Sequence, residues 1–182
     1  KKKKKMEAWK YTSLAPLEQL ELSKNDTATA PHIPAIDGLN SLDLVFVNGQ
    51  LQSDINALPL PQGLHISSLR EASTQQQAAA TTLFAKIKPE RHLFGLVNDA
   101  LVKDGVLIDI DAGIKIERPI RIVNLSSDGQ ESHHRILVRL GKDAEATVIE
   151  QGQGEQASLS TGFAEYEIGE QANLEHYRLA MH

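Results

Sequence analysis

Apolar residues along this chain follow a helical period in places before residue 105 and a strand period after it. Residues 93–101 have helical spacing, and Gly105 stands where a helix is expected to end. From residue 106 onward apolar and polar side chains alternate, which is typical of strands with one buried face. The pattern therefore predicts a smaller α+β region over residues 6–104, followed by a β core over residues 105–182.

The strongest local signal before residue 105 is a β-hairpin. In LVFVNGQLQ, residues 44–52, apolar strand residues flank Asn48-Gly49, the pair that best supplies two positive φ angles in a tight turn. The other elements predicted for this region are a leucine-patterned helix at residues 14–22, a loop at residues 23–42, a short strand from Leu64, and a helix running to Ala85 from a capping box formed by Ser68 and Glu71.

The β region repeats itself. Three strings align without gaps, namely IDAGIKIE from Ile110, LGKDAEAT from Leu140 and IGEQANLE from Ile168, so their first residues are 30 and 28 positions apart. A fixed period of this size, combined with short alternating strands and tight polar turns, predicts a stack of coils in a parallel β-helix. Small residues that would suit its narrow interior are Ala144, Ala146 and Ala172. Alternation alone also allows an antiparallel sandwich or barrel.

Composition limits the class of protein. Hydrophobic residues make up 41% of the chain and aromatic residues only 4%, which predicts a globular protein with a mainly aliphatic core. No apolar run approaches the roughly 20 residues needed to cross a bilayer, so a membrane location is not expected. The chain has no cysteine, which excludes disulfides and thiolate sites within it. We expect a cytoplasmic protein.

The five lysines at residues 1–5 have no relation to the sequence that follows, and we interpret them as a tag or an artefact. Without them the formal net charge changes from −5 to −10. A surface of that charge repels phosphate backbones, so nucleic acid is not an expected partner.

Seven histidines raise the question of a metal site. His133 and His134 are adjacent, so in a strand they would point to opposite faces and could not easily share a metal ion. They fall in the polar stretch SSDGQESHHR, and we interpret them as exposed loop residues. His176 lies in a charged strand pattern and is expected on the surface or at a partner contact. Three further histidines, each isolated in the sequence, are His32, His65 and His92.

A second candidate site consists of carboxylates. Asp109 and Asp111 would share one face of a strand, with Glu117 after the next turn. Polysaccharide-cleaving enzymes with a β-helix use paired carboxylates for catalysis. The other interpretation, which we favour, is that these carboxylates form the solvated face of an alternating strand. Gly152 and Gly154 are interpreted as a flexible turn between coils. We therefore assign no catalytic, cofactor-binding or metal-binding residue from the sequence.

In three segments, at residues 7–14, 94–124 and 144–150, the chain resembles the SufB/SufD family of iron–sulfur cluster assembly proteins. EAWKYTSL, residues 7–14, is similar to the start of the ordered part of the SufD branch, and its WKYT element favours that branch over SufB. AEATVIE, residues 144–150, is also similar to SufD. Residues 94–124 resemble the family's helix-to-first-coil junction at Asn98, Ala100, Leu101, Asp104-Gly105, Ile108 and Pro119-Ile120. The resemblance covers nearly everything after the lysines.

This resemblance implies a right-handed parallel β-helix, in agreement with the repeats. It also implies a component of the SufBCD complex that pairs with a SufB-like protein and, through a C-terminal helical domain not contained in this chain, with a SufC-like ATPase. Iron–sulfur clusters would form transiently on the full complex, and this chain would hold no cofactor. The family's cluster-ligating and SufC-binding residues would lie beyond His182, so none is transferred to this sequence.

We therefore expect a scaffold without enzymatic activity that acts in cytoplasmic iron–sulfur cluster assembly. The alternative is a β-helical carbohydrate-active enzyme that uses Asp109, Asp111 or Glu117. A coil stack that ends at His182 would expose its apolar interior, so formation of a homo-oligomer through that end is a further expectation.

Overall fold

The described part of the chain is built mainly from β-strands. The computed structural model describes residues 32–33, 35–70, 93–154 and 158–181. Its elements are β1 (Leu42–Val47), β2 (Gln50–Leu51), the 3-10 helix η2 (Ile55–Ala57), β3 (Leu64–Ser68), α3 (Leu93–Leu101), β4 (Asp104–Ile110), β5 (Ile120–Ser126), β6 (Glu131–Ser132), β7 (His134–Leu140), β8 (Glu145–Gly154), β9 (Leu159–Ser160), β10 (Phe163–Ile168) and β11 (Asn173–Met181).

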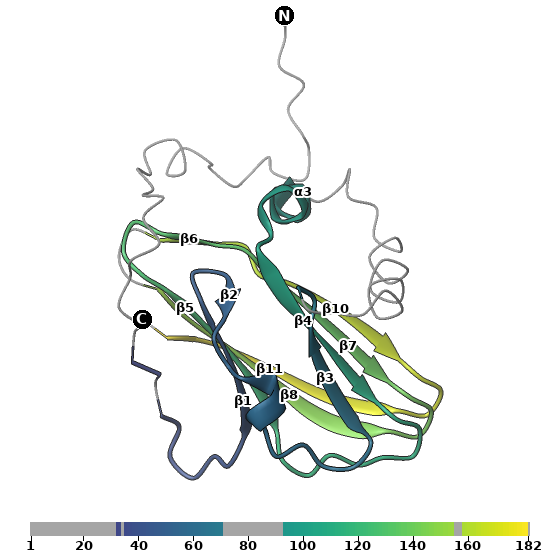
Figure 1. Ribbon diagram of the computed structural model, residues 1–182. Helices are drawn as coiled ribbons and strands as arrows, with labels where there is room; N and C mark the ends of the chain where they lie inside the picture. Colours follow the sequence, from purple (N-terminus) through teal and green to yellow (C-terminus); the bar gives the residue numbers. More distant parts are fainter. Residues whose placement is uncertain (1–31, 34, 71–92, 155–157, 182) are drawn as a thin grey trace, which may run out of the picture.

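The long strands form two facing sheets (Figure 1). The strand orders are β11-β8-β5-β1-β2 and β10-β7-β4-β3, and β6 and β9 make a small third sheet. From β4 onward the long strands alternate between the two large sheets, so each turn of the chain, here called a coil, adds one strand to each sheet. These strands pair in parallel, which excludes the antiparallel arrangement for the repeat region.

The three repeated strings lie in register across neighbouring coils. Ile110 pairs with Leu140, and Leu140 pairs with Ile168, so the first residue of each string occupies the same place in its coil. The tight turn is repeated as well, since the fourth residue of each string has a positive φ angle. These residues are Gly113 (74°), Asp143 (58°) and Gln171 (58°). The 28- to 30-residue period predicted from the sequence is therefore confirmed as the structural repeat.

An aliphatic core fills the space between the two sheets. Its fully buried members include Leu44, Phe46, Ile108, Ile120 and Ile122. The small residues predicted to face a narrow interior do so: Ala144 and Ala146 are buried, and Ala172 packs against the same core. Strands β1 and β3 contribute to this core together with the later strands, so the described strands on both sides of residue 105 share it.

The predicted hairpin is confirmed. Strands β1 and β2 pair antiparallel, and the turn residues Asn48 and Gly49 have φ angles of 49° and 79°. The short strand predicted from Leu64 is β3. Three other predictions fall outside the described residues, namely the origin of the five lysines, the helix at residues 14–22 and the helix from the capping box to Ala85.

The prediction that Gly105 ends a helix is wrong. Helix α3 ends at Leu101, where the Val102 N–H donates to the Asn98 carbonyl, and Gly105 lies inside β4. A Cβ at Gly105 would lie 2.5 Å from the carbonyl oxygen of Arg135, its partner in β7. The glycine therefore permits close approach between two strand backbones, which is the other common reason for glycine in a strand.

Candidate functional site

In the β1-β5-β8-β11 sheet, residues that pair across neighbouring strands form rows, and the rows that face the interior change from apolar to charged in the later strands. One row begins with Leu44 and Ile122 and continues with Glu150 in β8 and Arg178 in β11. The neighbouring row ends in His176 after three aliphatic residues. Because an unpaired charge costs free energy in an apolar interior, charged residues at these positions mark a candidate functional site.

Glu150 is the centre of this polar cluster. Its Oε1 accepts a hydrogen bond from the Tyr166 hydroxyl (2.6 Å), and its Oε2 accepts one from Nη2 of Arg178 (3.0 Å). Nε2 of His176 lies 2.8 Å from Oε1, and since a carboxylate only accepts, this nitrogen is the donor. The Glu150 side chain is 15% exposed, against 66% for Arg178, so the guanidinium lies on the solvent side of the carboxylate.

The cluster fixes the protonation of its two inner members. Burial acts to raise the pKa of the Glu150 carboxyl, but the hydrogen bond from Tyr166 and the charge of Arg178 outweigh it, so this pKa lies below its ordinary value. Burial, together with the hydrogen bond to Glu150, raises the pKa of the Tyr166 hydroxyl. Glu150 is therefore an ionised acceptor and Tyr166 a protonated donor at neutral pH.

His134, the first residue of β7, faces the same interior and is 5% exposed. Its ring lies against Phe46, with 5.1 Å between centroids, and against Gly162, where a Cβ would lie 2.7 Å from Nε2. Burial lowers the pKa of His134 to about 4, so the ring is neutral at pH 7. Its Nδ1 is buried and has no hydrogen-bond partner among the described residues.

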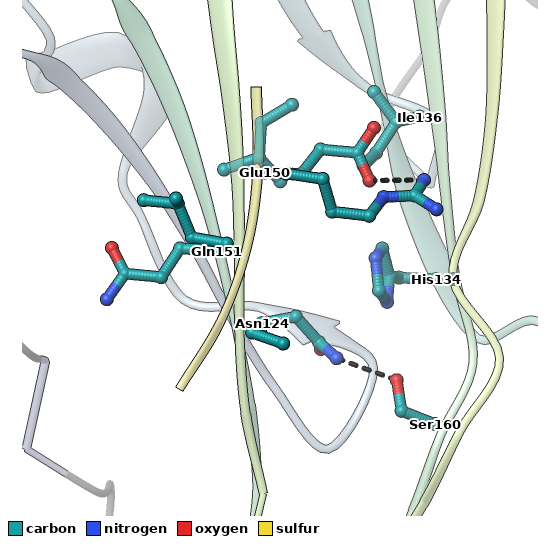
Figure 2. Close-up of a pocket in the computed structure, with 12 residues that line it drawn as sticks. Asn124, His134, Ile136, Glu150, Gln151 and Ser160 are labelled. Atoms are coloured by element: carbon teal, nitrogen blue, oxygen red, sulfur yellow. Dashed lines mark hydrogen bonds and ion pairs between the residues drawn. The ribbon is translucent and has the colours of Figure 1, made fainter. Parts of the chain in front are cut away.

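A cavity of about 270 Å³ lies between the two sheets at this cluster. Figure 2 shows His134, Glu150 and Ser160 reaching it from β7, β8 and β9, whereas Gln151 points away. Asn124 also lines the cavity and donates from Nδ2 to the Ser160 hydroxyl (2.8 Å). The cavity exists partly because Gly152, at an inward position of β8, has no side chain: nothing lies within 4 Å of where its Cβ would be.

The glycines of β8 are not the flexible turn that the sequence suggested. Gly152 and Gly154 both lie in β8, where they pair with Asn124 and Ser126 of β5. The strand continues through them because the parallel ladder to β5 supplies partners for the backbone, which outweighs the weak strand preference of glycine.

The interpretation of His133 and His134 as exposed loop residues is wrong. His133 is 2% exposed, with Nδ1 2.6 Å from the Thr161 hydroxyl and Nε2 3.3 Å from Glu131. The polar stretch includes β6 and the start of β7, and contacts with Thr161, Gly162 and Phe46 bury the two rings. The two residues do turn to different partners, as adjacent strand residues should. His176 is exposed, as expected, and its ring faces Glu150.

The remaining predicted residues lie away from the cavity. His65 and Asp111 form an exposed pair, with 3.2 Å between Nε2 and Oδ2. Asp109 is held by the guanidinium of Arg139 on the neighbouring strand β7. Glu117 and His32 are exposed, and His92 falls outside the described residues. The structure therefore does not gather Asp109, Asp111 and Glu117 around a common cavity among the described residues.

Sequence reasoning did not find Glu150, Tyr166 and Arg178 as a group. A signal for Glu150 was present, because it follows Ala146 and Val148 at alternate positions and so shares their buried face. Tyr166 and Arg178 lie on other strands, and only the fold brings them to the carboxylate.

Lowering the pH is expected to destabilise the fold through His134. Its pKa is about 4 when folded and about 6.5 when unfolded, so the unfolded chain binds more protons between these values. The contribution of His134 to the free energy of unfolding is therefore complete above about pH 6.5 and is lost as the pH falls toward about 4. From pH 7 to pH 5 we expect a loss of about 2 kcal/mol from this group, measured by urea unfolding.

The matched variant for this measurement is His134→Gln, which keeps a polar side chain that does not titrate. Its free energy of unfolding should fall less than that of the unmodified chain over the same pH interval. Equal losses in both proteins would show that other groups cause the acid sensitivity.

Two properties of the described residues bear on the class of protein. No group of three or more His, Asp or Glu side chains is placed there to hold a metal ion. None of the helices in the described ranges is long and apolar enough to cross a membrane.

Comparison with known proteins identifies the family. Residues 2–122, roughly two thirds of the chain, match the family model for the SufBD protein N-terminal region. The matched residues include the β1–β2 hairpin, helix α3 and the first long strands of both sheets. A search of curated proteins found no match. The chain therefore belongs to the SufB/SufD family, whose N-terminal region it contains.

Proposed function

We propose that this chain is a SufD-type scaffold of the SufBCD complex. Membership of the SufB/SufD family gives it a part in iron–sulfur cluster assembly. The WKYT element at residues 9–12 favours the SufD branch. In this proposal the protein acts in the cytoplasm, has no catalytic activity of its own, and contributes to a complex on which clusters are held transiently.

The mechanism of such a scaffold is geometric. We take the coil stack to be part of a right-handed parallel β-helix, whose paired strands make a stiff platform. Among the described strands, β11 and β10 are the outermost of their sheets on the side away from β1 and β3. Outermost strands are templates for the strands of another chain, because one row of their backbone groups has no neighbour within the sheet.

The family match over residues 2–122 carries this proposal, and the contact surface we assign consists of large apolar side chains exposed on these two strands. They are Ile168 on β10, at 45%, and Tyr177 and Leu179 on β11, at 52% and 39%. Apolar and aromatic side chains beside an open strand edge suit a β-structured partner. We propose that a SufB-like protein is this partner, and that a SufC-like ATPase is bound through a domain outside this chain.

The carbohydrate-active alternative gains no support from the geometry. Asp109 is engaged by Arg139 and Asp111 by His65, so neither is poised beside a second carboxylate as hydrolysis of a glycoside requires.

Co-purification tests the scaffold proposal. The chain, co-expressed with SufB-like and SufC-like proteins from the same organism, is expected to retain the SufB-like protein on an affinity resin. Leu179→Lys should lower this retention at least about tenfold, because it places a charge in the apolar contact. The control is Leu96→Lys on α3, whose side chain is similarly exposed, at 43%. No retention by the unmodified chain, or equal losses in both variants, would contradict the proposal.

A further inference from the structure

Glu150 has little acceptor capacity left for a molecule in the cavity. Three of its roughly four lone-pair sites are used by Tyr166, His176 and Arg178. The adjoining guanidinium also offsets its negative charge. A carboxylate engaged in this way is a poor ligand for a further cation.

The other polar groups around the cavity are mainly hydrogen-bond donors. Arg178 has five N–H donors, and in the described part of the chain its side chain bonds Glu150 through Nη2. Ser160 accepts from Asn124, which leaves its own O–H to donate. Nδ1 of the buried His134 has no partner in the described ranges, and a neutral imidazole can present an N–H there.

The walls of the cavity are suited to a small, partly aliphatic molecule. Ile122 and Ile136 supply apolar surface, and Phe46 and Gly162 hold the His134 ring in place. Water occupies about 30 Å³ per molecule in the liquid, so the volume of about 270 Å³ accommodates a ligand of roughly ten non-hydrogen atoms. An unpartnered buried nitrogen beside such a space is satisfied only if something polar enters it.

We propose that this cavity binds a small carboxylate with a short aliphatic chain. Its carboxylate would lie between the Arg178 guanidinium and Nδ1 of His134, with the Ser160 hydroxyl as a further donor. The planar guanidinium matches a carboxylate and forms charge-assisted hydrogen bonds with it. The aliphatic part would contact Ile122 and Ile136. This site shares strand β11 with the scaffold proposal but rests on side chains that face the interior of the coils. Its test uses the isolated chain without a partner, so the two proposals can fail separately.

Titration with sodium butyrate, followed by NMR of the ¹⁵N-labelled chain at pH 7, tests the proposal. The His134 ring nitrogens and Arg178 Nε are expected to shift and to saturate below about 50 mM butyrate, at constant ionic strength. Butyramide has the same shape without the charge and should produce no saturable shift.

Three variants test whether butyrate binds in this cavity. Arg178→Gln is expected to weaken binding at least about tenfold. Arg139→Gln removes the same charge from the outer face and should leave binding unchanged. Gly152→Val fills the open space beside the strand backbone; it should abolish binding and raise the unfolding temperature, because it adds a strand-favouring side chain without a clash.

Several results would overturn the proposal. These are an absence of saturable shifts with butyrate, equal responses to butyrate and butyramide, and equal weakening by the two arginine variants. If Arg178→Gln fails to fold, Ser160→Ala and Gly152→Val serve in its place. Undiminished binding in Gly152→Val would likewise exclude this cavity as the site.

Discussion

Replacing Asn98 by alanine is expected to lower the free energy of unfolding by about 3 kcal/mol. Asn98 lies on α3 and is fully buried. Its Nδ2 donates to the carbonyl oxygens of His134 (3.0 Å) and Thr161 (2.6 Å), and its Oδ1 accepts from Nε of Arg135 (3.0 Å). Alanine would remove three hydrogen bonds and leave buried polar groups without this partner.

This side chain also joins parts of the fold that are far apart in sequence. Helix α3 lies at the end of the sheet where β4 begins (Figure 1). Through Asn98 the helix is bonded to the start of β7 and to the residue two positions before β10. Loss of these bonds should therefore loosen the helix from two successive coils together.

Urea unfolding followed by circular dichroism measures the effect. The matched control is Asn173→Ala, because Asn173 is exposed and should contribute less than about 0.5 kcal/mol. A loss in Asn98→Ala no larger than in the control would show that the three hydrogen bonds add no net stability.

Replacing Arg121 by alanine should cost about 3 kcal/mol of unfolding free energy, for an electrostatic reason. Its side chain is 8% exposed and lies between β1 and β8. Nε donates to Oδ1 of Asp43 (3.0 Å), Nη2 donates to Oδ2 of the same residue, and Nη1 donates to Gln151 (3.3 Å). Alanine would leave the Asp43 carboxylate and the buried Gln151 amide without these bonds.

The pKa of Asp43 reflects the same contact. Burial acts to raise the pKa of this carboxyl, but the hydrogen bonds from Arg121 and Ser41 outweigh it and lower the pKa below its ordinary value. Without Arg121 the pKa should rise, so this carboxyl should cost the variant less stability on acidification than it costs the unmodified chain in the range where Asp43 titrates.

A second arginine–aspartate pair provides an internal control. Arg139 on β7 donates from Nε to Asp109 on β4 (2.9 Å), again between neighbouring parallel strands. The Arg139 side chain is 40% exposed, so water screens the pair, and Arg139→Ala should cost less than about 1 kcal/mol. Similar losses for the two arginines would show that burial does not set the strength of these ion pairs.

The sequence was sufficient to predict the repeat and its turns. Apolar alternation and the fixed spacing of Ile110, Leu140 and Ile168 are local properties, and the fold preserves them as parallel register. The family resemblance in residues 94–124 agreed with this pattern, and the family itself is confirmed by the match over residues 2–122. Periodicity predicts which side of a strand is buried, but not which distant group lies opposite.

That difference explains what sequence reasoning missed. Arg121 stands between Ile120 and Ile122, so alternation places it on the outer face. It is nevertheless buried, and its partner Asp43 lies 78 residues away in the sequence, where no local pattern reveals it. His134 looked like a loop residue because its neighbours are polar. Its burial depends on contacts with Phe46 and Gly162, which no sequence spacing reveals.

Stacking also determines the order in which such a chain can fold. Each long strand from β7 onward lies beside the strand one coil earlier, a separation of 28 or 30 residues along the chain. Adding a coil therefore closes a loop of nearly constant length, with nearly constant entropic cost, against a template that is already formed. Folding should nucleate in one coil and then proceed by the addition of one neighbouring coil at a time.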